Sequence, residues 1–113
     1  MQMHLHPEIF EQVANGTKTV EARVNDEKRQ KLKVGDIITV LKRPDEIEAL
    51  FVRITGLRYF KDFTELADNY SMEQLYSSTY TKEQYLELFP KFYSETEIAT
   101  FGTVAIEFEL IER

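Results

Sequence analysis

The sequence predicts an α+β fold, in which an antiparallel or mixed sheet of about five to six strands curls into a small β-barrel with several short helices. Strand-like segments come first, helical segments fill residues 62–93, and one last strand closes the chain, without the βαβα alternation of a parallel sheet. The final strand is expected to return to the first sheet. The length of 113 residues suits a single domain over residues 1–113.

The first quarter of the chain predicts a strand, a helix and a second strand. Residues 1–6 alternate enough for a short strand. Pro7 suits the first turn of a helix and Asn15-Gly16 supplies its end, so we expect a helix over about 7–15. In Lys18–Val24, apolar residues at positions 20, 22 and 24 alternate with polar ones, which is the period of a half-buried strand.

Two further strands are expected in the middle of the chain. The polar segment 26–31 suits a turn of helix or an ordered loop. Residues 37–41 have high strand propensity, and residues 49–59 predict a long strand with a bulge or bend at Gly56. The Lys-Arg-Pro-Asp run at 42–45 is a turn signal between these two strands.

The helical part begins at Asp62, where an N-cap residue precedes a carboxylate by three positions, as in a capping box. Further helices are expected to begin at Ser71 and near Thr81, and Pro90 ends the last of them. Residues 96–100 can add another turn. Residues 101–111 then alternate between apolar and acidic positions and predict the closing strand.

Composition excludes several kinds of site. The chain has no Cys, which excludes disulfides, thiolate metal sites and a cysteine nucleophile. His4 and His6 have no third ligand at useful spacing, so we expect no metal. Four isolated glycines exclude a Gly-rich phosphate loop, and we expect no cofactor. Without a membrane-length apolar run or a signal-peptide pattern, we expect a cytoplasmic protein that does not contact membranes, as a monomer or weak homodimer.

Charge is distributed unevenly along the chain. The net charge of −6 argues against a protein that coats duplex nucleic acid. Residues 1–43 carry a balance of +2, however, whereas residues 44–113 carry −8. An anionic partner is therefore expected to meet the first third of the chain, in a small local contact and not along a long groove.

The strand at 18–24 carries the candidate chemistry. Residues two apart on a strand share a face, so Glu21 and Arg23 lie together, with Thr19 beside them and Lys18 at the start of the strand. A carboxylate between two cations is favoured in its ionised form. Lys18 and Arg23 would remain available to grip a phosphate or an oxyanion. The alternative is that these charges only make a solvent-facing strand polar.

The run Gly16-Thr17-Lys18-Thr19-Val20-Glu21-Ala22-Arg23, followed by Asn25-Asp26-Glu27-Lys28-Arg29 and Val34-Gly35-Asp36, resembles the signature of the ASCH domain family. The preceding strand and helix match the family's N-terminal pattern, and Gly102–Phe108 looks like its last strand. The resemblance implies a PUA-like fold, with a cleft between barrel and helices that accepts RNA or a modified nucleoside.

One branch of that family consists of amidohydrolases that remove the acetyl group from N4-acetylcytidine with a Lys, a Thr and a Glu. The Lys aligns with Lys18, but the Thr position falls on Glu21, a departure that leaves Thr19 as a nearby hydroxyl. Glu73 is the nearest candidate for the family's Glu. By our hypothesis for an enzyme, Glu21 would activate a water and Lys18 with Arg23 would steady the oxyanion.

Three functions therefore remain open. The chain is expected to bind RNA or a modified nucleoside in a cleft built on Lys18, Glu21 and Arg23, to deacylate acylated pyrimidine nucleosides, or to sense a nucleotide-like ligand through a protein partner. Expected ligand contacts are Arg23, Asn25, Lys28, Arg29 and Tyr93. Aromatic residues that are candidates to stack on a base, one or two of them facing the cleft, are Tyr76, Tyr80, Tyr85, Phe89, Phe92 and Tyr93.

Overall fold

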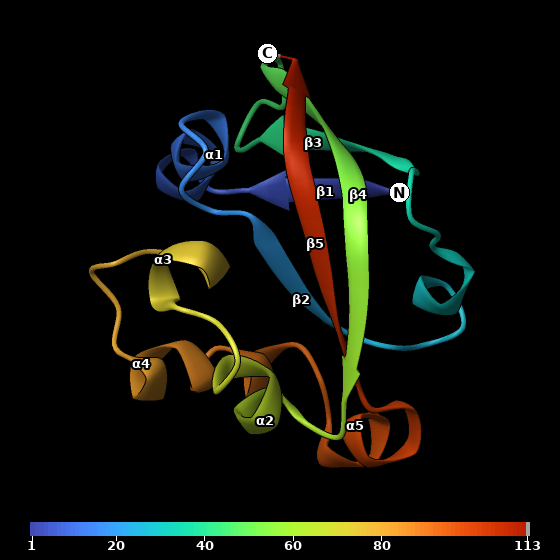
Figure 1. Ribbon diagram of the computed structural model, residues 1–113. Helices are drawn as coiled ribbons and strands as arrows, with labels where there is room; N and C mark the ends of the chain where they lie inside the picture. Colours follow the sequence, from blue (N-terminus) through green and yellow to red (C-terminus); the bar gives the residue numbers. More distant parts are fainter. Residues whose placement is uncertain (113) are drawn as a thin grey trace.

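The computed structural model describes residues 1–112 as a curled, mixed five-stranded sheet with the helices packed around it (Figure 1). The strand order is β1-β3-β4-β5-β2. The strands are β1 (Gln2–Leu5), β2 (Val20–Val24), β3 (Ile37–Lys42), β4 (Ala49–Phe60) and β5 (Thr103–Glu112). β1 runs parallel to β3, and the other neighbouring strands are antiparallel. The predicted α+β class and barrel-like sheet are confirmed, as a half-barrel.

The two edges of this sheet are β1 and β2, and both come to the same side of the molecule because the sheet curls. The closing strand β5 lies between β4 and β2, as expected for a last strand that returns to the first sheet. The expected irregularity at Gly56 is also confirmed, because the register of β4 against β5 shifts between Ile54 and Gly56.

Several helices begin at residues whose side chains cap them. Ser71, Thr81 and Ser94 each form a capping box, whereas Asp62 only accepts a bond from the backbone of Glu65. Gly102 ends the last helix at φ 68°, and Phe101 therefore belongs to that helix and not to the closing strand. The helices are α1 (Pro7–Ala14), η1 (Arg29–Lys31), α2 (Phe63–Ala67), α3 (Met72–Leu75), α4 (Lys82–Leu86), η2 (Phe89–Lys91) and α5 (Glu95–Phe101).

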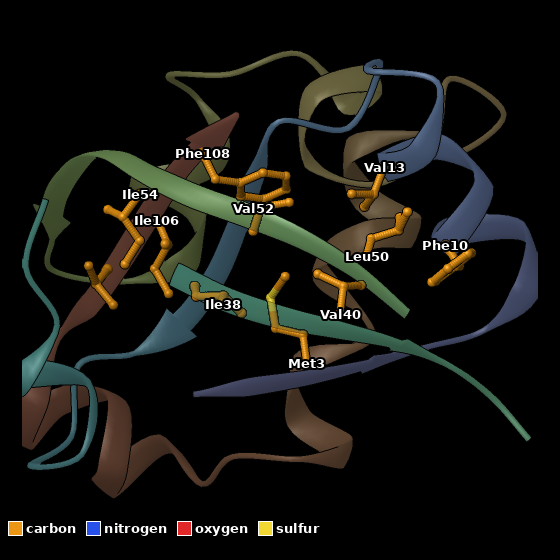
Figure 2. Packing of buried hydrophobic residues seen from close by; sticks show 11 residues of the cluster. Met3, Phe10, Val13, Ile38, Val40, Leu50, Val52, Ile54, Ile106 and Phe108 are labelled. Atoms are coloured by element: carbon orange, nitrogen blue, oxygen red, sulfur yellow. The ribbon is translucent and has the colours of Figure 1, made fainter. Parts of the chain in front are cut away.

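The inner face of the half-barrel packs against α1 and forms the first core (Figure 2). Alternate residues of β3, β4 and β5 point inward, and α1 covers them with Phe10 and Val13. Ten of the eleven cluster members are labelled in the figure: Met3, Phe10, Val13, Ile38, Val40, Leu50, Val52, Ile54, Ile106 and Phe108.

The outer face of β2 and β5 packs against the helices α2–α4 and forms a second core. Val20, Ala22 and Val24 belong to it, together with Ala105 of β5 and, from the helices, Phe63, Leu66, Ala67, Leu75 and Tyr85. The predicted alternation of the second strand is correct. Its polar face is not fully solvent-exposed, however, because Glu21 is buried and Arg23 is partly buried.

Candidate functional site

The register of β2 against β5 places Glu21 and Arg23. Glu21 lies opposite Ile106 and Arg23 opposite Val104, and both partners belong to the inner core. Residues directly opposite in an antiparallel pair point to the same face. Glu21 and Arg23 therefore point toward the inside of the half-barrel, at its β2 edge.

Glu21 forms ion pairs with two cations at once. Its Oε2 lies 2.6 Å from a guanidinium nitrogen of Arg23, and its Oε1 lies 3.0 Å from Nζ of Lys18. The Glu21 side chain is 9% exposed and that of Lys18 only 1%. The three side chains predicted to act together are thus in contact, and two of them are buried.

Lys18 lies just before β2 and turns inward. Its Nζ donates to the backbone oxygens of Val20 and Leu75, each at 2.6 Å, in addition to its contact with Glu21. An ammonium group has three donors, so these three oxygens account for all of them. The neutral amine has only two N–H donors and would direct its lone pair at an oxygen. Lys18 therefore holds β2 and α3 together as a cation and has no donor left for a ligand.

The pKa values in this cluster follow from burial and charge. Burial alone would raise the pKa of Glu21, but the charges of Arg23 and Lys18 outweigh it and hold the pKa below its usual value. Burial lowers the pKa of Lys18 against the opposing effect of Glu21. The Glu21 carboxylate raises the pKa of Arg23. Glu21 is thus a stable anion and a weak base at neutral pH.

An open cleft of about 940 Å³ lies beside this cluster. Residues of both edge strands contribute to it, as do Lys18, Glu21 and Arg23. Among the described residues, Glu21 supplies its one carboxylate, whereas its Lys and Arg residues are Lys18, Arg23, Lys28, Arg29, Arg43 and Lys91. The cleft is therefore basic in a chain whose net charge is −6.

The segment after β2 brings Arg29 to this group. Arg29 is fixed by Asp26, whose Oδ1 accepts from the Arg29 backbone N–H at 3.1 Å and whose Oδ2 lies 3.1 Å from Nη1. The charge of Arg29 also helps to lower the pKa of Glu21. The Nε atoms of Arg23 and Arg29, and Oδ1 of Asn25, are buried without a hydrogen-bond partner. Such atoms mark positions where a further partner is expected.

Aromatic side chains from the helical part form the opposite wall. The ring centroids of Tyr93 and Phe63 lie 5.8 Å apart, and Tyr93 also interacts with Arg23. These contacts within the protein occupy part of the Tyr93 side chain. Phe92 is 73% exposed and lines the cleft. The aromatic residues of this wall are Tyr76, Tyr85, Phe89, Phe92 and Tyr93. Of these, Phe92 presents the largest free surface for stacking.

Three of the residues predicted for the site do not line the cleft. The backbone N–H of Thr19 donates to the backbone oxygen of Gln74, and the backbone oxygen of Thr19 accepts from the N–H of Phe108. Glu73 is exposed on α3, and Asn25 lies just after β2. Lys18, Glu21, Arg23, Lys28, Arg29 and Tyr93 do line it.

Sequence reasoning missed Arg43 and Lys91, which reach the cleft from the turn after β3 and from η2. The sequence at 42–45 predicts a turn, but nothing in it indicates that this turn lies near β2. The sequence predicts helices around Lys91, but its position at the cleft depends on how those helices pack.

No group of three or more His, Asp or Glu residues within 1–112 has the geometry to hold a metal ion, and His4 pairs with Glu46 at 2.6 Å. Across the same residues, no helix has the length and apolar character needed to cross a membrane. The cytoplasmic location and the monomeric or weakly dimeric state stay predictions.

Comparison with known proteins identifies the family. The model of the ASCH domain matches residues 3–112. The chain belongs to the ASCH domain family. This family is associated with RNA binding. A search of curated proteins finds no match.

Solved structures agree with this assignment. The crystal structure of hypothetical protein PH0355 is 32% identical, with a TM-score of 0.81 over 97% of each chain. The solution structure of protein PF0455 from Pyrococcus furiosus is 28% identical, with a TM-score of 0.74 over 99% of this chain and 97% of that one. The crystal structure of ASCH from Zymomonas mobilis is 17% identical (TM-score 0.58, covering 97% of this chain and 68% of that one) and shares the fold.

Proposed function

We propose that this ASCH domain binds a short single-stranded segment of RNA in the cleft beside β2. The observation that carries the proposal is the concentration of Lys and Arg in that cleft, in a chain that is acidic overall. A polyanion is attracted to such a patch and repelled by the surrounding surface. Binding is therefore confined to the few nucleotides that the cleft admits.

The aromatic wall supports single-stranded RNA over a duplex. Unstacked bases can pack on aromatic rings, whereas bases within a duplex cannot. Phe92 offers such a ring at the rim of the cleft, next to Lys91. A volume of about 940 Å³ is in the range of pockets that enclose one drug-sized ligand. The cleft therefore suits about one to three nucleotides.

The test is the salt dependence of binding to a short single-stranded oligoribonucleotide, followed by calorimetry. For single strands, log K falls with log salt by about 0.7 for each phosphate contact. Lys28→Gln removes a cation that lines the cleft, and we expect it to reduce this slope by about 0.7. Lys31→Gln, which makes the same charge change on the same segment but outside the cleft, should leave the slope unchanged. Absence of binding, or equal effects of the two substitutions, would refute the proposal.

Deacylation of an N4-acetylcytidine-type nucleoside is the second candidate. It is favoured by Lys18, which aligns with the Lys of the amidohydrolase branch and contacts Glu21, the residue that stands where that branch has a Thr. The geometry gives it less support than binding, because the donors of Lys18 are occupied and both oxygens of Glu21 are in ion pairs. Incubation with N4-acetylcytidine and detection of cytidine by mass would establish turnover. A ligand sensor, the third hypothesis, would use the same cleft.

A further inference from the structure

We infer that Arg23 and Arg29 form a subsite for a phosphate monoester, so that the ligand is the phosphorylated end of a nucleotide chain. This inference rests on the proposed function, since it specifies which part of an RNA the cleft holds. It separates a terminal phosphate from an internal phosphodiester and from a neutral nucleoside.

The first argument is the pair of unsatisfied donors. Both Nε atoms are buried without a partner, although both side chains line the cleft. The Arg23 and Arg29 side chains are 25% and 19% exposed, and each is already held by a carboxylate, Glu21 in one case and Asp26 in the other. The guanidinium planes are thus fixed in advance, and planar forks of this kind match phosphate oxygens. Each guanidinium can donate to phosphate oxygens through the part of the side chain that is exposed to the cleft, while its buried Nε–H still lacks an acceptor.

The second argument is charge balance. Lys18, Glu21 and Arg23 together carry +1, the pair of Arg29 with Asp26 is neutral, and Lys28 adds +1. Arg43 and Lys91 also line the cleft and add +1 each, so the net charge around it is +4 with Asp26 counted. A phosphate monoester carries about −1.5 to −2 at pH 7, whereas a diester carries about −1. The monoester dianion compensates up to twice as much of this charge as the diester does.

The experiment compares three forms of triuridylate by calorimetry: one with hydroxyls at both ends, one with a 5′-phosphate and one with a 3′-phosphate. We expect one phosphorylated form to bind at least about ten-fold more tightly than the dihydroxyl form, as charge-assisted bonds to two guanidiniums require. This advantage should grow between pH 5.5 and 7.5, because the monoester gains its second charge near pH 6.

Two matched substitutions locate the subsite. Arg29→Gln should reduce the advantage of the phosphorylated form to less than about three-fold, while Arg53→Gln, on the outer face of β4, should retain it in full. Arg29→Lys keeps the positive charge but loses the planar guanidinium group, and the affinity advantage of the phosphorylated form should then be intermediate.

Equal affinity for phosphorylated and dihydroxyl triuridylate would overturn the inference and leave the proposed RNA site standing, and this comparison needs only the unaltered protein. Retention of the advantage in a folded Arg29→Gln protein would also overturn it. Failure of all three oligonucleotides to bind would refute the proposed function and the subsite together.

Discussion

The buried carboxylate of Glu21 lies between two cations, and its negative charge stabilises the folded protein. Substituting Glu21→Gln would leave Lys18 and Arg23 buried or half-buried without their shared carboxylate. Removing one partner of a buried pair costs about 3–5 kcal/mol. We therefore expect the free energy of unfolding at pH 7 to fall by that amount, as measured by urea unfolding. Glu83→Gln, at an exposed position in the first turn of α4, should change it by less than about 1 kcal/mol.

The same carboxylate predicts how stability depends on pH. The pKa of Glu21 in the folded protein lies below its usual value of 4.5, so the unfolded chain binds more protons between the two values. The stabilisation by Glu21 is therefore complete above pH 4.5 and is lost as the pH falls through the folded pKa. Urea unfolding from pH 6 to 2 should show a steeper loss of stability in the unaltered protein than in Glu21→Gln. Parallel curves for the two proteins would contradict this assignment.

The sequence pattern predicts which side chains share a face on β2, but not what covers that face. The period of two correctly places Glu21 with Arg23. Whether their face is solvent-exposed depends on the curl of the sheet and on its pairing with β5, which is about 80 residues further along the chain. Lys18 is a similar case: its acceptor on Leu75 is 57 residues away, so local spacing could not indicate that its donors are occupied.

At the scale of elements, the short helix α3 depends on Lys18. A helix of four residues is not stable alone, and α3 is held by the bonds from Lys18 Nζ to Leu75 O and from Thr19 N to Gln74 O. Lys18→Met keeps the bulk of the side chain but leaves the backbone oxygens of Val20 and Leu75 and the Glu21 carboxylate without their donor. We expect unfolding to become easier by about 3–5 kcal/mol and amide exchange in α3 to accelerate more than elsewhere.

The control for this substitution is Thr81→Ala, which removes the capping box of α4 and should cost about 1 kcal/mol. Its effect on hydrogen exchange should be confined to α4. If Lys18→Met accelerated exchange evenly over the whole chain, then α3 would not depend on this side chain in particular.

The helical part also explains why Glu73 does not reach the cleft. Its place in the central helical region makes it the nearest candidate for the Glu of the amidohydrolase branch. Successive residues of a helix are rotated by about 100°, so residues two apart point in nearly opposite directions. Leu75 is buried in the second core, and Glu73 therefore faces solvent. Helix phase, once the buried position is known, would have excluded it.

At the scale of the molecule, the contrast between a basic first third and an acidic remainder is readable from the sequence, and most of the residues that line the cleft belong to that first third. The elements that complete the cleft are not readable in the same way. Arg43 follows β3 and Lys91 belongs to η2, and they meet β2 only because the half-barrel brings its two edges together and the helices pack beside them. Composition therefore predicts that an anion site exists, while topology decides which side chains build it.

The cleft combines a charged wall with an aromatic one, and these make separable contributions to RNA binding. Phe92→Ala removes a ring that is 73% exposed at the rim, and stacking of one base on such a ring is worth about 1–3 kcal/mol. We expect the affinity for single-stranded RNA to fall accordingly, with an unchanged salt slope because no charge is lost. Lys91→Gln, at the adjacent position, should reduce the slope by about 0.7.

The matched control is Tyr59→Ala, which removes an aromatic ring that is 59% exposed on β4 and does not line the cleft. It should leave both the affinity and the slope unchanged in the same titrations. An equal loss of affinity from Tyr59→Ala and Phe92→Ala would mean that exposed aromatic surface in general binds the RNA. A change of salt slope in Phe92→Ala would mean that the ring positions a cation, since stacking alone releases no counterions.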